Sequence, residues 1–159
     1  MPYVCKTIDS PVGPLKLVAS QKGLAAVLWG EEDSRVRLSP MVEDPDHPIL
    51  VETERQLRAY FAGRLRTFTV PLDFTGTTFQ KNVWAALLTI PFGETRSYAE
   101  IARQIGKPAA VRAVGAANGR NPISIIAPCH RVIGSSGALT GFAGGLMAKQ
   151  RLLEMERVT

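Results

Sequence analysis

The chain has 159 residues, of which 45% are hydrophobic, and a formal net charge of +5. This length can form one compact unit or two small lobes around a hydrophobic core. The start, MPYVCK, opens no apolar stretch of signal-peptide length, and no apolar run approaches the roughly 20 residues that span a bilayer. These features disfavour a secreted or membrane-spanning protein, and we expect one of the cytoplasm or nucleoid.

The charge is divided unevenly between the two halves of the chain. Residues 1–75 carry 9 Lys and Arg against 10 Asp and Glu, a net charge of −1, whereas residues 76–159 carry 10 against 4, a net charge of +6. A basic half beside a near-neutral half favours contact of the second half with a polyanion such as nucleic acid.

Three short runs near the start predict an antiparallel meander. They cover residues 3–8, 15–19 and 24–29, and the turn sequences SPVGP and QKG separate them. Residues 68–74 predict one more strand.

Residues 49–62 predict a helix that covers this sheet, because their apolar side chains recur at helical spacing and Gly63 ends the pattern. The sequence TGTT at 75–78 then marks a boundary. We expect an N-terminal α/β lobe over residues 1–75 and a C-terminal domain over residues 76–159.

Beyond this boundary the apolar residues recur at helical spacing. A first helix begins near Phe79, and the sequence PFG stops it. Ser97 is predicted to cap a second helix, because Glu100 three residues later completes a capping box. Residues 109–118, nearly all small, and residues 146–157 predict two further helices.

The Ser97 helix and the helix over 109–118, joined by the turn GKP, form a helix-turn-helix candidate, although such pairs also occur as plain packing motifs. The second helix offers mostly Ala and Gly, so it has little with which to read bases in the major groove. Small side chains suit the minor groove instead, where Arg112 could insert into the base stack. The alternative is that the alanines pack on the preceding helix.

Cys5 and Cys129 are the two cysteines of the chain, and neither stands in a C-x-x-C or histidine-spaced zinc pattern. In a reducing compartment both thiols are expected to stay reduced. A site that uses one thiol is therefore favoured over a disulfide or a metal site. One of the two histidines, His47, lies in the acidic, Pro-rich sequence EDPDHP and is predicted to be a solvated loop residue.

The sequence PCHR places the Cys129 thiol beside an imidazole and a guanidinium, and nearby positive charge favours the reactive thiolate. Adjacent residues of a strand point to opposite faces, so a working pair with His130 needs a turn or helical start, which Pro128 favours. A bridging water would join this pair more readily than direct contact. Glu154 or Glu156 could orient the histidine. The alternative is a buried structural cysteine next to a surface histidine.

These residues resemble those of a known family, the methylated-DNA–protein-cysteine methyltransferases, also called O6-alkylguanine-DNA alkyltransferases. The matches lie in family-like order between Thr78 and Glu156 and include TFQ, VW, IP, RAVG, NP, PCHRV, GG and LL. The N-terminal lobe matches more loosely, at SPVGPL and YFAG. The resemblance implies an α+β fold: a ribonuclease H-like lobe with a small antiparallel sheet and a helix, then a mostly helical domain with a helix-turn-helix.

The resemblance also implies an activity. It is DNA repair by direct, irreversible and stoichiometric transfer of an alkyl group from O6-alkylguanine, and also from O4-alkylthymine, to Cys129. His130 would act as a base through a water, oriented by Glu156. Tyr98 would supply a hydrogen bond or a proton at guanine N3. Asn121 would brace the turn that joins the helix-turn-helix to the site.

Double-stranded DNA is the implied partner, bound through its minor groove with the alkylated base flipped out and Arg112 in the gap. The implied DNA contacts are Tyr98, Ala99, Lys107, Arg112 and Ser135. Val132 and Ala143 would line the guanine pocket. We expect a monomer that uses no cofactor and no metal, because too few cysteines and histidines remain for the structural zinc of some relatives.

The main alternative is a non-enzymatic alkyltransferase-like protein that only binds the lesion. Such proteins lack the acceptor cysteine, so the presence of Cys129 counts against it. A helix-turn-helix regulator is disfavoured by the alanine-rich second helix. A Cys-His hydrolase is disfavoured because no oxyanion or substrate-cleft signal accompanies the thiol.

Overall fold

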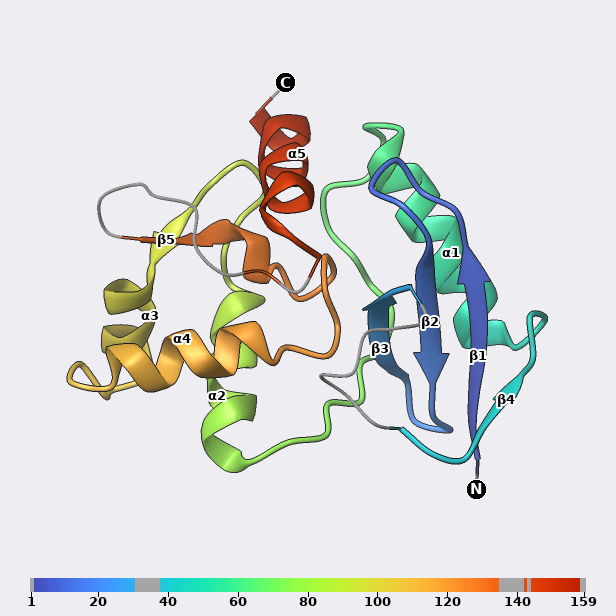
Figure 1. Cartoon of the computed structure of the whole chain (residues 1–159), viewed down its shortest axis with the longest axis horizontal. Coiled ribbons are helices and arrows are strands. Elements are labelled where there is room, and N and C mark those ends of the chain that lie inside the picture. Colours follow the sequence, from blue (N-terminus) through green and yellow to red (C-terminus); the bar gives the residue numbers. More distant parts are fainter. Residues whose placement is uncertain (1, 31–37, 135–141, 143, 158–159) are drawn as a thin grey trace. The chain divides into compact units, whose positions relative to one another are not determined.

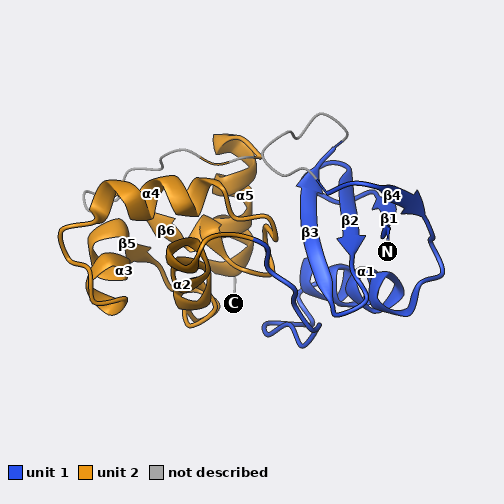
Figure 2. Ribbon diagram, turned by 90° about the horizontal axis from the view of Figure 1, so that it is seen from below, with its two compact units in different colours: residues 1–75 blue, residues 76–159 orange. Residues whose placement is uncertain are grey.

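The computed structural model describes residues 2–30, 38–134, 142 and 144–157. The chain forms two compact units, Met1–Thr75 and Gly76–Thr159 (Figure 2). The first unit is built on a sheet and the second on helices, and the prediction of an α+β fold is confirmed.

The sheet of the first unit has the strand order β3-β2-β1-β4 (Figure 1). Strands β1 (Tyr3–Ile8), β2 (Leu15–Ala19) and β3 (Leu24–Trp29) pair antiparallel, which confirms the predicted meander. Strand β4 (Met41–Glu43) was not predicted and adds a parallel edge to β1. Its three residues are too few for a periodic pattern to reveal it.

Helix α1 (Pro48–Phe61) packs against β1, β2 and β3, as predicted. The face that it buries includes Leu50, Leu57 and Tyr60. The prediction for His47 was incomplete, because this residue caps the helix: its Nδ1 accepts a hydrogen bond of 3.3 Å from the backbone N–H of Ile49. A histidine is an uncommon N-cap, so the sequence carried no usual capping signal.

The strand predicted over residues 68–74 does not form. The segment makes one isolated parallel bridge, between Leu72 and Leu24. The backbone N–H of Leu24 donates to the carbonyl of Pro71 at 2.8 Å. The backbone N–H of Thr69 donates to the side chain of Gln56, and not to the backbone of a neighbouring strand. Pro71 has no N–H to continue a ladder, so regular pairing stops at the bridge.

In the second unit, α2 (Thr78–Leu87) is tied to α4 (Val111–Gly119) by a buried hydrogen bond of 2.8 Å from Trp84 Nε1 to the carbonyl of Ala117. Helix α3 (Tyr98–Gln104) packs against both and forms the helix-turn-helix pair with α4. The predicted capping box is confirmed, since Ser97 and Glu100 exchange hydrogen bonds with each other's backbone N–H.

The end of the second unit brings the Cys129 segment against the last helix. A 3₁₀ turn, Cys129–Arg131, leads into β6 (Val132–Ile133), which pairs in parallel with β5 (Arg96–Ser97). Helix α5 (Leu146–Arg157) packs on this turn and has the predicted bounds. None of the helices in the described part of the chain is long and apolar enough to cross a membrane.

Candidate active site around Cys129

Cys129 is buried, with 3% of its surface exposed, at the start of the 3₁₀ turn. Two tight backbone turns precede it. In the first, the N–H of Ile126 donates to the carbonyl of Ser124 around Ile125, whose φ of 75° is rare and strained for a β-branched residue. In the second, the N–H of Cys129 donates to the carbonyl of Ala127 around Pro128. The helical start predicted after Pro128 is therefore present.

Two buried asparagines hold this segment from the side of α4. Asn121 donates from Nδ2 to the carbonyl of Ala127 at 2.8 Å, and its Oδ1 accepts from the N–H of Ile123 at 3.0 Å. Asn118, within α4, donates to the carbonyl of Cys129 at 3.4 Å. The loop that carries the thiol is thus bound to the end of the helix-turn-helix.

His130 is fully buried, and its Nε2 lies 2.7 Å from Oε2 of Glu156. Residue spacing left Glu154 and Glu156 open, and the family resemblance implied Glu156. Glu156 faces the site, whereas Glu154 is exposed and accepts from Gln150. The other ring nitrogen, Nδ1, is buried and has no hydrogen-bond partner within the described ranges. No direct bond therefore joins this nitrogen to the Cys129 thiol.

Glu156 also binds Arg131, which is 6% exposed. Nε of Arg131 donates to Oε1 at 2.8 Å and Nη2 donates to Oε2 at 3.0 Å, while Nη1 donates to the carbonyl of Ile90 at 2.7 Å. The carboxylate of Glu156 is therefore shared between an imidazole and a guanidinium.

A second cation, Lys149, is completely buried on α5. Its Nζ donates to the carbonyl of Val132 at 2.7 Å. Burial lowers the pKa of Lys149, and the Cys129 thiolate opposes that lowering. The attraction acts on both charges, so the ammonium favours the thiolate.

Burial and the neighbouring charges together set the protonation state of His130. Burial is the main cause that lowers the pKa of His130, and hydrogen bonding and charge from Glu156 oppose it. The charges of Arg131 and Lys149 lower this pKa further. The neutral imidazole is thus the favoured form, which is the form that can accept a proton.

Sequence reasoning assigned no role to Lys149, and it treated Arg131 only as a positive charge beside the thiol. A signal for the lysine existed, because Lys149, Leu152, Leu153 and Glu156 recur at helical spacing and form the buried face of α5. A lysine and a glutamate on an otherwise apolar face indicate buried charge with a partner. No sequence signal linked Arg131 to its partners Ile90 and Glu156, which are distant in the sequence.

The residues expected to meet DNA lie mainly on α3 and α4. Tyr98 is the half-buried first residue of α3, close enough to α4 that a Cβ at Gly115 would lie 3.8 Å from its ring. Arg112 on α4 and Lys107 in the turn are exposed, and Ala99 is half-buried.

The start of α3 lies next to the cysteine segment, because Ser97 and Ile133 are partners in the parallel pair of β5 and β6. Val132, predicted to line the pocket, is completely buried and is the partner of Arg96 in the same pair of strands. Ser135 and Ala143 lie outside the described residues.

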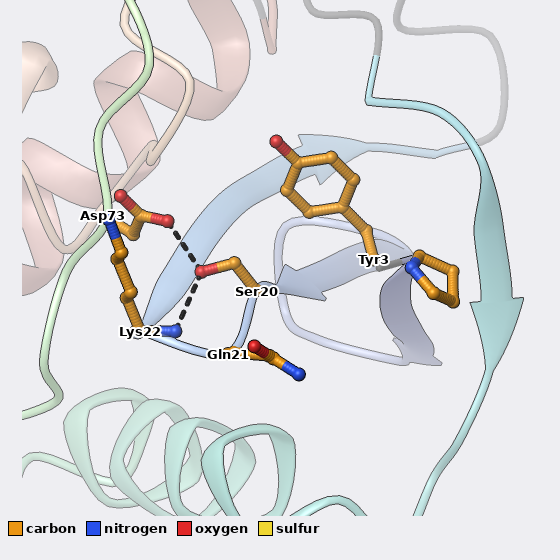
Figure 3. A pocket seen from close by; sticks show the side chains of 6 residues that line it. Tyr3, Ser20, Gln21, Lys22 and Asp73 are labelled. Atoms are coloured by element: carbon orange, nitrogen blue, oxygen red, sulfur yellow. Dashed lines mark hydrogen bonds between the residues drawn. The ribbon is translucent and has the colours of Figure 1, made fainter.

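The first unit holds a separate small pocket of about 230 Å³ (Figure 3). Its wall includes Tyr3 and the turn at Ser20, whose hydroxyl donates to Asp73 at 2.5 Å. None of the predicted site residues lines it.

Across the described residues, no three His, Cys, Asp or Glu side chains gather in a group that could hold a metal ion.

Comparison with known proteins identifies the family. Residues 3–74 match the family model described as 6-O-methylguanine DNA methyltransferase, ribonuclease-like domain. Residues 78–158 match the model described as 6-O-methylguanine DNA methyltransferase, DNA binding domain. The ribonuclease-like character expected of the N-terminal lobe is thereby confirmed.

Two relatives and one solved structure indicate the same family as the two family models. The chain is 55% identical to a methylated-DNA–protein-cysteine methyltransferase of Mycobacterium bovis, over 96% of this chain and 91% of the relative. It is 52% identical to one of Methanosarcina barkeri, over 94% of each. A crystal structure of Mycobacterium tuberculosis OGT in complex with DNA has a TM-score of 0.88 at 54% identity, over 99% of this chain and 93% of that chain. This chain therefore belongs to the 6-O-methylguanine DNA methyltransferase family.

Proposed function

We propose that this protein repairs double-stranded DNA by moving an alkyl group from O6 of guanine, and also from O4 of thymine, to the thiol of Cys129. The observation that carries the proposal is the buried group of Cys129, His130 and Glu156 in the unit that also holds the helix-turn-helix. In this proposal, the second unit is the DNA-binding and alkyl-acceptor domain.

The reaction requires a thiolate, because the alkyl carbon on O6 is a poor electrophile. The thiol proton of Cys129 passes through a water to Nδ1 of His130, and Glu156 stabilises the imidazolium that forms. Lys149 favours the thiolate by its charge. Sulfur then bonds to the alkyl carbon as the bond from that carbon to O6 breaks.

The electron pair of the broken bond passes into the purine, where the hydroxyl of Tyr98 donates a hydrogen bond or a proton at N3. The product on Cys129 is a thioether, which no neighbouring base can reverse. The other thiol, Cys5, lies in β1 of the first unit. Each molecule therefore acts once, and the reaction needs no cofactor.

Helix α4 suits approach to the minor groove. Its exposed face includes Arg112, Ala113 and Ala116, whereas Val114 and Ala117 pack inward. Small side chains on the exposed face let the backbone enter a groove about 6 Å wide. Arg112 is the exposed long side chain among them that can fill the place of a flipped base.

Further DNA contacts come from the neighbouring turn and helix start. Lys107 and Ala99 belong to this surface, and Ser135 belongs to it by family resemblance. Val132 lines the pocket of the flipped base, Ala143 is assigned to this pocket by family resemblance alone, and Asn121 holds the turn between α4 and Cys129. We place the protein in the cytoplasm, as a monomer that binds the nucleoid during repair.

The test is a mass measurement on the reduced, folded protein after incubation with a duplex that contains one O6-methylguanine. We expect one methyl group on the peptide that contains Cys129 and no second transfer when more DNA is added. Cys129→Ser serves as the control, which should bind this DNA without accepting the group. Wild-type protein that binds the duplex but leaves its Cys129 peptide unmodified would instead be a lesion-binding protein.

A further inference from the structure

The carboxylate of Glu156 has more partners than orientation of His130 requires. Oε2 lies 2.7 Å from Nε2 of His130 and also accepts from Nη2 of Arg131 at 3.0 Å, while Oε1 accepts from Nε of Arg131 at 2.8 Å. All three residues are at most 6% exposed. A buried guanidinium is expensive to desolvate, so its presence beside the base calls for a physical reason.

Arg131 is held in place on several sides. Its Nη1 donates to the carbonyl of Ile90 at 2.7 Å, and the ring of Phe92 lies 5.8 Å from its guanidinium carbon. Since the two bonds to Glu156 form a planar fork, the guanidinium also fixes the plane of the carboxylate.

We propose that Arg131 is a positioning residue of the reaction: it fixes Glu156 and keeps His130 neutral, with its proton on Nε2, until the Cys129 thiol releases its own proton. This inference rests on the proposed function. In this role Arg131 controls the protonation of His130 before the reaction and does not contact the alkyl group.

The position of the proton follows from hydrogen bonding. Two hydrogen bonds from Arg131 keep the carboxylate of Glu156 ionised, and an ionised carboxylate can only accept hydrogen bonds. Nε2 of His130 must therefore carry the hydrogen that it donates to Glu156. A neutral imidazole then has its lone pair on Nδ1. This atom is buried and has no hydrogen-bond partner among the residues that the structure describes, so it remains available to a proton.

The surrounding charges oppose protonation of the resting histidine. Burial lowers the pKa of His130, Glu156 opposes it, and the cations of Arg131 and Lys149 lower it further. Cys129 precedes the histidine, and its thiolate would favour the imidazolium. The only charged residue of α2, which also packs on the 3₁₀ turn, is the exposed Lys81. Removal of the Arg131 charge should therefore shift the balance toward imidazolium.

The first measurement uses the wild-type protein. Nitrogen-15 chemical shifts of the histidine rings distinguish the two neutral tautomers and the imidazolium, and the chain has only two histidines to assign. We expect His130 to be neutral with hydrogen on Nε2 at pH 7, and His47 gives a second ring signal in the same sample. A resting imidazolium, or hydrogen on Nδ1, would overturn the proposal without any variant.

The second measurement compares Arg131→Gln with Arg131→Lys. The glutamine variant should raise the pKa of His130 and slow alkylation by free O6-benzylguanine about tenfold to a hundredfold, as expected when a base loses its alignment. In the glutamine variant, the pH below which alkylation slows should also be higher than in the wild-type protein. Arg131→Lys keeps the charge, so His130 should stay neutral while the rate falls less.

A matched control exists in α1, where Arg55 makes the same two-bond fork with Glu52 on the surface. Arg55→Gln should change neither the His130 signals nor the pH profile. If Arg131→Gln retains the wild-type tautomer and pH profile, Arg131 is only structural.

If the Arg131→Gln variant does not fold, the nitrogen-15 spectra of the wild-type protein and of Arg131→Lys test the protonation state of His130. Alkyl transfer to wild-type Cys129 tests the proposed function separately, since transfer with the wrong His130 tautomer would refute only this inference.

Discussion

Two pairs of arginine and glutamate in this molecule have the same geometry and different surroundings. In α1, Nε of Arg55 donates to Oε1 of Glu52 at 2.9 Å and Nη2 donates to Oε2 at 2.5 Å. Arg131 and Glu156 use the same four atoms at 2.8 and 3.0 Å. The side chains of the first pair are 66% and 42% exposed, and those of the second pair are 7% and 2% exposed.

Exposure changes what such a pair does. On the surface, hydrogen bonds from Arg55 and then Gln56 lower the pKa of Glu52 to about 2, but water and salt compete with the pair, and it adds little to stability. In the interior, both ions lose their hydration, and removal of one partner leaves the other as an uncompensated buried charge that destabilises the fold. The buried pair is therefore sensitive to any change, and it is next to the proposed base.

The largest effect should come from Glu156→Gln, which leaves the charge of Arg131 buried and uncompensated. We expect a loss of about 3–5 kcal/mol in the free energy of unfolding. Alkylation should slow by about a hundredfold or more, because His130 loses the group that orients it. Chemical denaturation and single-turnover kinetics measure the two effects. Glu154→Gln, on the exposed face of the same helix, is the control and should change neither.

A smaller and more selective effect should follow from Arg112→Ala. This arginine is exposed on α4, far in the sequence from the buried cluster, so the variant should keep wild-type stability. Repair of a duplex with O6-methylguanine should slow about tenfold or more, whereas reaction with free O6-benzylguanine should be nearly unchanged. The ratio of the two rates is the measurement. Equal losses on both substrates would contradict the role of filling the gap.

The buried cluster should also make stability fall in mild acid. The pKa of His130 is lowered from its ordinary value of 6.5, so the unfolded chain binds this proton more readily than the folded protein. Stability is therefore retained above pH 6.5 and decreases as the pH falls below it, by at most about 1.4 kcal/mol per pH unit. Carboxylates such as Glu52, with an ordinary pKa of 4.5, contribute at lower pH.

Urea denaturation between pH 7.5 and 5 measures this decrease. His130→Gln should remove most of it, because glutamine does not titrate. His47→Gln, which changes the partly exposed cap of α1, is the matched control and should leave it in place. A wild-type stability that is flat across this range would contradict a neutral resting His130.

The smallest effect should come from Arg55→Met, which breaks the surface fork. We expect a change in unfolding free energy close to the error of the denaturation experiment and no change in alkylation rate. Measured beside Glu156→Gln, this variant tests whether burial, and not the two-bond geometry, makes the second pair important. A large loss from Arg55→Met would remove the contrast between the two pairs.

The sequence by itself predicted the features that depend on local periodicity and capping. The meander over β1, β2 and β3, the capping box of Ser97 and Glu100, and the bounds of α5 all follow from residues close together in the chain. Local chemistry also pointed to Cys129 and to the turn after Pro128. Each of these signals is readable because its partners lie within a few residues.

Only the tertiary structure decided the contacts that join distant residues. The segment 68–74 forms a single bridge, because Pro71 and the Gln56 side chain take the place of regular pairing. Residue spacing left Glu154 and Glu156 open, and only the family resemblance implied Glu156. Glu156 meets His130 because α5 packs one face on the 3₁₀ turn, 26 positions away in sequence. The same packing buries Lys149 and Arg131. A charged residue becomes sensitive to its neighbours when packing removes water, and its sequence position alone does not report that burial.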